Sequence, residues 1–200
     1  MFIKKQLKII LEVSCWLIVI RMVDLKIPDG VSVEFDLDTV KISGPKGGAS
    51  KRFFHPRLKF EVKDGSFVIN SKTKKMLKKD KMFINTFVAH IKNLFKGVID
   101  GYEYRLKICS GHFPMTVSVV GNEVLIKNYL GEKIPRKAKI MEGSKVEING
   151  DEIIVKGLNK EIVGQSAARI EQATRITNRD RRIFQDGCFI TVKAGKAMAK

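Results

Sequence analysis

The chain repeats a series of short alternating segments, and this duplication constrains its fold more than any other feature. Alternation of apolar and polar residues is the pattern of half-buried strands, and it occurs first at 31–35, 39–42 and 58–62. The series returns 86 residues later, at 117–120, 124–127 and 144–148. An amphipathic helical pattern follows each series. The sequence therefore predicts an α+β fold of two tandem duplicated modules, each a small antiparallel sheet with a helix packed on one face.

The repeat also predicts the domain boundaries. We expect an N-terminal extension at 1–22, a first module at 23–101, a second module at 102–192 and a basic tail at 193–200. The two helices are predicted from the apolar stripes at 83–98 and 161–176. The tail consists of small and basic residues, and we expect it to be disordered.

The first 22 residues lie outside the repeat. A basic start precedes an apolar run at 9–20, which is typical of a signal peptide. Glu12 interrupts that run, however, no small-x-small cleavage site follows it, and a run this short does not span a bilayer as a helix. Our preferred hypothesis is that Met22 is the functional start and that no stable membrane association exists. The alternative is an exported or membrane-anchored protein that uses this segment.

The charge of the chain predicts a polyanionic partner. There are 38 Lys and Arg residues against 21 Asp and Glu residues, a net charge of +17. Such an excess repels itself unless a polyanion neutralises it, and nucleic acid binding through these charges would depend strongly on salt. A basic surface kept for solubility and a membrane surface are the weaker alternatives.

No residue pattern indicates catalysis. His55, His90 and His112 have no acidic partner at an informative spacing, and no nucleotide-binding or nucleophile motif occurs. Three widely separated cysteines (15, 109 and 188) suit neither a zinc site nor a disulfide framework. We expect reduced thiols, and we predict no enzyme activity, no metal, no cofactor and no small-molecule substrate.

Two segments of the first module have open interpretations. The loop Gly44–Gly47 contains Lys46, and such a loop lets backbone amides and an ammonium group approach phosphates. It also matches the Gly-x-x-Gly loop of KH domains, which joins two helices, whereas this one follows a predicted strand; a plain turn is the third interpretation. The lysine-rich stretch 72–81 is either a solvated loop or a second RNA contact.

The second module carries the stronger electrostatic signal. Lys127, Lys133, Arg136, Lys137 and Lys139 cluster around Gly131. Arginines on and after the second helix are interleaved with amide and hydroxyl side chains, which suit phosphate and ribose contacts. The arginines are at 169, 175, 179, 181 and 182, and the polar residues among them include Gln165, Ser166, Gln172 and Asn178.

Several motifs resemble one known family. In the second module they are the segments 128–133, 164–168, 171–174 and Asp186-Gly187, and in the first module 40–47 and 91–98. Together, from about residue 23 to residue 190, they resemble the universal large-subunit ribosomal protein six family, whose eukaryotic members are numbered nine in older naming. His112-Phe113-Pro114 favours its archaeal and eukaryotic branch.

The resemblance implies a structural constituent of the large ribosomal subunit in the cytoplasm, with neighbouring ribosomal proteins as partners. It implies ribosomal RNA binding chiefly through the second module, near the sarcin-ricin region where translation factors dock; a free KH-like RNA-binding or RNA-chaperone module is the alternative. With Lys46 of the glycine loop added, the predicted RNA contacts are Lys127, Lys133, Arg136, Lys137, Gln165, Ser166, Arg169, Gln172, Arg175, Asn178, Arg179, Arg181 and Arg182. Segment 76–83 lacks the tryptophans common in eukaryotic relatives, so partner contacts there are not carried over.

Overall fold

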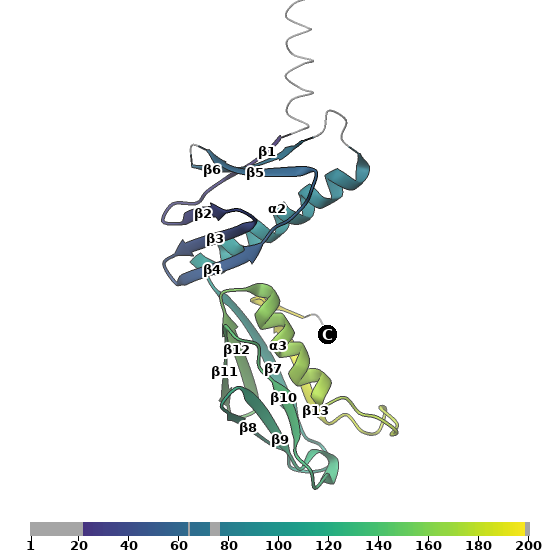
Figure 1. Ribbon diagram of the computed structural model, residues 1–200. Helices are drawn as coiled ribbons and strands as arrows, with labels where there is room; N and C mark the ends of the chain where they lie inside the picture. The colour runs from purple at the N-terminus through teal and green to yellow at the C-terminus, as the bar shows by residue number, and fades with distance from the viewer. Residues whose placement is uncertain (1–21, 64, 73–76, 199–200) are drawn as a thin grey trace, which may run out of the picture. The chain divides into compact units, whose positions relative to one another are not determined.

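The computed structural model describes residues 22–63, 65–72 and 77–198 (Figure 1). The chain divides between Ile99 and Asp100 into two compact units, which are described separately below. Predictions for the extension at 1–21, for Cys15 and for residues 73–76 fall outside the described residues. In the parts of the chain that are described, no helix is both long and apolar enough to cross a membrane.

The first unit contains two antiparallel three-stranded sheets and a helix. One sheet has the strand order β1-β6-β5 and the other β2-β3-β4. The elements are β1 (Met22–Lys26), β2 (Ser32–Asp36), β3 (Thr39–Gly44), β4 (Gly47–Arg52), β5 (Leu58–Lys63), β6 (Ser66–Ser71) and α2 (Lys78–Ile99).

Phenylalanine rings dominate the core of the first unit. Helix α2 packs against β3 and β4 and buries Ile84, Ile91 and Val98 from the predicted stripe. The ring of Phe87 meets the rings of Phe53 and Phe60 edge-on, at centroid distances of 5.5 and 5.3 Å. Such edge-to-face pairs are favourable beyond the area that they bury. Most of the apolar stripe of the helix is therefore packed against its own module.

Helix α2 begins earlier than the apolar stripe predicts. The buried carboxylate of Asp80 accepts a hydrogen bond from the backbone N–H of Leu77 at 3.0 Å and pairs with Arg57 at 3.3 Å. A carboxylate in the first turn satisfies free N–H groups and the helix dipole. Lys78 and Lys79 are consequently helical, and the interpretation of 72–81 as one solvated loop was wrong for its last four residues.

The second unit has a five-stranded antiparallel sheet, β11-β12-β7-β13-β14, and a three-stranded one, β10-β9-β8. Helix α3 packs against β7, β10, β12 and β13. The elements are β7 (Tyr102–Cys109), β8 (Thr116–Val120), β9 (Glu123–Lys127), the 3₁₀ turn η1 (Tyr129–Gly131), β10 (Arg136–Lys139), β11 (Ser144–Asn149), β12 (Glu152–Gly157), α3 (Lys160–Ala173), β13 (Gly187–Lys193) and β14 (Lys196–Ala197). Two modules of antiparallel sheet and helix confirm the predicted α+β class.

The basic tail is not disordered where the structure describes it. Strand β13 extends to Lys193 and pairs with β14, with Val192 opposite Ala197. The turn between them places Ala194 and Gly195 at positive φ, 50° and 78°, and two-residue hairpin turns of this kind require such angles. The prediction of disorder from composition was therefore wrong for residues 193–198.

Candidate nucleic-acid interface

Helix α3 presents a polar face opposite the one that it buries. Its N-cap, Asn159, accepts a hydrogen bond from the N–H of Glu161 at 2.9 Å, as N-cap side chains do. Val163, Ala167 and Ile170 are fully buried at helical spacing. The predicted contacts Gln165 and Gln172 are exposed and Arg169 is half-buried. These three side chains follow one another at four- and three-residue steps and so share one face of the helix.

Ser166, by contrast, belongs to the buried face. Its side chain is 1% exposed, its hydroxyl accepts a hydrogen bond from the N–H of Met141 at 3.0 Å and lies 2.8 Å from the Ser144 hydroxyl. A side chain enclosed in this way does not reach RNA. The prediction of Ser166 as an RNA contact was wrong, because its hydroxyl ties α3 to the turn before β11.

Arg136 holds the end of α3. Its Nη1 donates to the carbonyls of Ala173 at 2.9 Å and Arg175 at 3.1 Å, and its Nε and Nη2 bind both carboxylate oxygens of Glu132 at 2.8 and 2.6 Å. Its guanidinium also lies 4.2 Å from the centre of the Tyr129 ring. The hydrogen bonds with Glu132 raise the pKa of Arg136 and lower that of Glu132. Because these contacts use most of its N–H groups, Arg136 has a structural role here.

Buried hydrogen bonds join the two ends of the loop after α3. The hydroxyl of Tyr129 donates to the carbonyls of Thr174 at 2.5 Å and Asp186 at 3.2 Å. The Thr174 hydroxyl accepts from the N–H of Cys188 at 3.0 Å. Burial raises the pKa of Tyr129. Residues 175–185, which we call the arginine loop, therefore start and end at fixed points.

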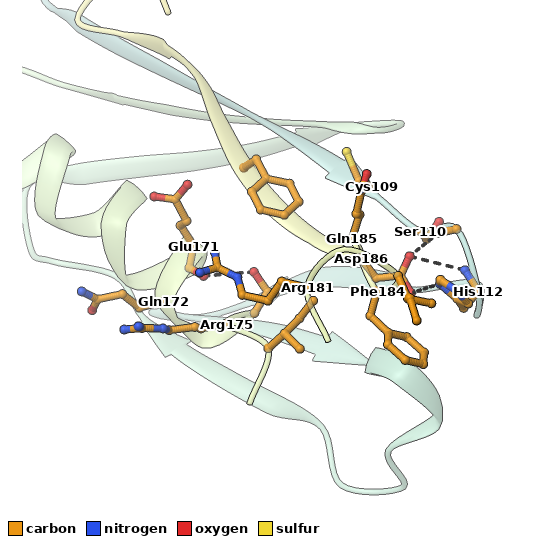
Figure 2. Close-up of a pocket in the computed structure, with 15 residues that line it drawn as sticks. Cys109, Ser110, His112, Glu171, Gln172, Arg175, Arg181, Phe184, Gln185 and Asp186 are labelled. Atoms are coloured by element: carbon orange, nitrogen blue, oxygen red, sulfur yellow. Dashed lines mark hydrogen bonds and ion pairs between the residues drawn. The ribbon is translucent and has the colours of Figure 1, made fainter. Parts of the chain in front are cut away.

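Asp186 also pairs with His112. One carboxylate oxygen of Asp186 accepts from the backbone N–H groups of Gly111 and His112, and the other lies 3.0 Å from His112 Nδ1 (Figure 2). The His112 ring packs on Phe184, with ring centres 4.8 Å apart. The sequence indicated no acidic partner for His112 at an informative spacing, and the structure supplies one from 74 residues away. Its partner is distant in sequence, so no local spacing indicated the pair.

The arginine loop carries exposed cations. Arg175, Arg179, Arg181 and Arg182 are exposed, as is Asn178, which has positive φ. Arg179 lies 5.0 Å from the centre of the Phe184 ring. Among the described arginines, those at 52, 57, 105 and 136 form ion pairs with carboxylates, whereas those at 169, 175, 179, 181 and 182 form none.

The predicted lysines of the second module belong to other elements than this group. Val124, Ile126 and Ala138 are buried in the core, and Lys127 and Lys137 alternate with them and are exposed. Residues that alternate along a strand point to opposite faces of the sheet, so both lysines point away from the core face. Lys133 is exposed in the segment between η1 and β10. The predicted contacts of this unit thus lie on α3 and its loop, on the β8–β10 sheet and, for Lys133, between η1 and β10.

The glycine loop of the first unit is the tip of a hairpin. Gly44 ends β3 and Gly47 starts β4, so the loop joins two strands and not the two helices of a KH domain. A Cβ on Gly44 would lie 2.2 Å from Val98 Cγ1, and the backbone N–H of Lys46 donates to the Val98 carbonyl at 3.2 Å. The glycine therefore allows close packing on α2. The Lys46 side chain is exposed, in a different unit from the other predicted contacts.

The remaining histidines, His55 and His90, lie against neighbouring side chains of the first unit. His90 Nδ1 lies 3.1 Å from Lys51 Nζ, and the His55 ring packs on Phe83 with centres 4.6 Å apart. Cys109 and Cys188 are free thiols, and burial raises the pKa of Cys188 to about 12. In the residues described, no group of three or more His, Cys, Asp or Glu side chains is placed to hold a metal ion.

Comparison with known proteins identifies the family. The family model described as Ribosomal protein L6 matches the chain twice, at residues 27–101 and 113–187. A protein of Methanosarcina mazei named "Large ribosomal subunit protein uL6" is 46% identical over 170 residues, which cover 85% of this chain and 96% of the relative. A protein of the same name from Methanococcus vannielii is 45% identical over 175 residues, 88% of this chain and 95% of the relative. The resemblance inferred from the motifs is therefore confirmed, and the chain belongs to the ribosomal protein L6 family.

Proposed function

We propose that this protein is a structural constituent of the large ribosomal subunit in the cytoplasm and binds ribosomal RNA chiefly through its second module. The names of its relatives support assembly into the large subunit. One observation carries the RNA contact: the five arginines of α3 and the arginine loop have no carboxylate partner among the described residues, whereas the other described arginines do. Unpaired guanidinium groups at high density need an external anion.

The proposed interface consists of the polar face of α3 and the arginine loop. Arginine forks bind phosphate oxygens in pairs, and amide side chains suit 2′-hydroxyl groups and base edges. The residues are Gln165, Arg169, Gln172, Arg175, Asn178, Arg179, Arg181 and Arg182. Both ends of this surface are fixed by Arg136, Tyr129 and Asp186, so little ordering is required on binding.

Lys127 and Lys137 form a second proposed contact, because they point away from the core face of the β8–β10 sheet. Lys133 is proposed as a further contact from the segment between η1 and β10. Lys46 is proposed as a peripheral phosphate contact from the first module. The position near the sarcin-ricin region and the contacts with neighbouring ribosomal proteins are part of the proposal and follow from the resemblance. We propose no catalytic activity.

Salt-dependent binding to transcribed large-subunit ribosomal RNA tests this proposal. Replacing Arg169 and Arg175 by Ala should weaken binding. It should also make the slope of log affinity against log salt less steep, by an amount that corresponds to the loss of up to about two phosphate contacts. The matched control replaces Arg52 and Arg105 by Ala, which removes the same charge from ion-paired positions. The control should keep the wild-type slope. Equal salt slopes for the two double variants would show that the RNA surface does not include α3.

A further inference from the structure

The second module has a hollow that phosphate binding alone does not explain. Its volume is ≈ 970 Å³, at the upper end of the roughly 300–1,000 Å³ of pockets that enclose small ligands. The end of β7, the end of α3, the arginine loop and Phe189 of β13 surround it. Figure 2 shows Glu171, Gln172 and Arg175 on one side of it and His112 with Asp186 on the other.

Part of the wall of this hollow is apolar and open to solvent. Ile183 is 63% exposed and Phe189 is 40% exposed. A Cβ on Gly187 would lie 3.3 Å from Phe189 Cζ, so the glycine leaves room for the ring to lie close to its own strand. A partly exposed aromatic ring of this kind can serve as a stacking platform for nucleic acid bases.

The rim supplies charge of the right sign for a nucleotide. Arg175 and Arg181 line the hollow and form no ion pair within the described chain, which leaves both for phosphates. Glu171 also lines it, and one of its carboxylate oxygens accepts from the N–H of Ile190 at 3.3 Å. The other oxygen can accept a hydrogen bond from the exocyclic amino group of a base.

An added peptide strand does not fit the same place. The outward N–H groups of β13 near the hollow belong to Cys188 and Ile190, and they already donate to Thr174 Oγ1 and to Glu171 Oε1. An extended peptide that joins a sheet edge needs such groups free. The combination of stacking ring, paired cations and carboxylate acceptor fits a nucleotide instead.

We propose that this hollow receives a single unstacked nucleotide of RNA, with its base against Phe189 and Ile183 and the flanking phosphates on Arg175 and Arg181. The proposal rests on the RNA-binding function proposed above and adds a specific ligand to that surface. A base with an exocyclic amino group suits Glu171. The stacking part of this contact does not depend on salt, because stacking releases no counterions, whereas the phosphate contacts of Arg175 and Arg181 do.

The test measures binding of Phe189 variants to transcribed large-subunit ribosomal RNA at several salt concentrations. Phe189→Ala and Phe189→Leu should each lower the affinity roughly 5- to 150-fold with the wild-type salt slope, whereas Phe189→Tyr should keep the wild-type affinity. The matched control is Phe54→Ala, which removes a 65% exposed ring from the first module and should change nothing. Circular dichroism verifies folding, and the Leu variant retains apolar bulk if the Ala variant does not fold.

Three outcomes separate this proposal from the function on which it rests. If the wild-type protein does not bind the RNA, the proposed function itself fails. If the wild type binds but the Leu variant binds equally well, the nucleotide site is overturned and the arginine surface stands. If the Tyr variant loses as much affinity as the Leu variant, or if the salt slope falls as well, stacking is not the contact and the proposal is again overturned.

Discussion

Helix α2 and helix α3 each pack on strands of their own module but differ in what they leave exposed. Helix α2 buries Ile84, Ile91 and Val98, and the described arginines of its module, Arg52 and Arg57, are ion-paired. Helix α3 buries Val163 and Ile170 and leads into a loop of unpaired arginines. Under the proposed function, the same architecture contributes mainly packing in one copy and the chief RNA contact in the other, because the solvent-facing positions differ.

The largest expected effects test whether the packing of the two helices is equivalent. Ile91 and Ile170 are 0% and 1% exposed, so replacing either by Ala should lower the free energy of unfolding by about 2–5 kcal/mol. Urea denaturation followed by circular dichroism measures both. Gln165→Ala on the exposed face of α3 is the control, with an expected change within about 0.5 kcal/mol. If only one of the two Ile variants lost less than about 1 kcal/mol of unfolding free energy, the two helices would not be packed equivalently.

Glycine contacts differ between the modules in a way that smaller substitutions can measure. A Cβ on Gly157 would lie 2.6 Å from Val163 Cγ2 and 2.8 Å from the Gly143 carbonyl oxygen, whereas a Cβ on Gly44 meets the Val98 side chain. Overpacking costs about 1–3 kcal/mol. We expect Gly157→Ala to be more destabilising than Gly44→Ala. The backbone around Gly143 can shift less to relieve a clash than the side chain of Val98 can.

Second-site variants separate this clash from other causes. Val98→Ala should recover part of the stability that Gly44→Ala loses, since it removes the contacting methyl group, although it leaves a cavity on its own. Gly48→Ala is the matched control, because its nearest atoms would be 3.7 Å away. Thermal unfolding measures the series. A Gly44→Ala protein as stable as the wild type would reopen the phosphate-loop interpretation of residues 44–47.

The sequence predicted the duplicated fold well because its signals are local. Alternation in the strands and the three-to-four-residue period of the helices depend on neighbouring residues. The burial of Ser166 was within reach of the same rule, since it lies three residues after Val163 and four before Ile170. The hydroxyl of Ser166 suits an RNA contact, but its position in the helical period places it on the buried face.

Other features depend on residues far apart in the chain. The pair of His112 and Asp186 and the contact of Arg136 with the end of α3 arise only when distant segments meet. Composition indicated a disordered tail, but two residues at positive φ and the pairing with β13 formed a hairpin instead. The hollow beside Phe189 likewise combines the end of β7, the end of α3, the arginine loop and β13, and no local pattern indicates it.

The last expected effect concerns alkaline pH and distinguishes the two cores. The buried cluster of the first module consists of Leu, Val, Ile and Phe side chains, whereas that of the second also contains Cys188 and Tyr102, Tyr104 and Tyr129. Burial raises the pKa of all four groups, that of Cys188 to about 12. A raised pKa in the folded state stabilises the protein fully below the ordinary pKa, and this contribution is lost as pH rises. The second module should therefore lose stability above about pH 9, and the first should not.

Urea unfolding between pH 8 and 11 measures this difference, followed by tyrosine absorbance because all three tyrosines lie in the second module. Between the ordinary thiol pKa and its folded value near 12, Cys188 alone steepens the fall by up to about 1.4 kcal/mol per pH unit. Cys188→Ala should remove that share and leave the share of the tyrosines, so its curve should fall less steeply whatever its stability at pH 8. Parallel curves for the wild type and the variant would mean that the thiol ionises alike in folded and unfolded chains, and the two cores would then differ only through their tyrosines.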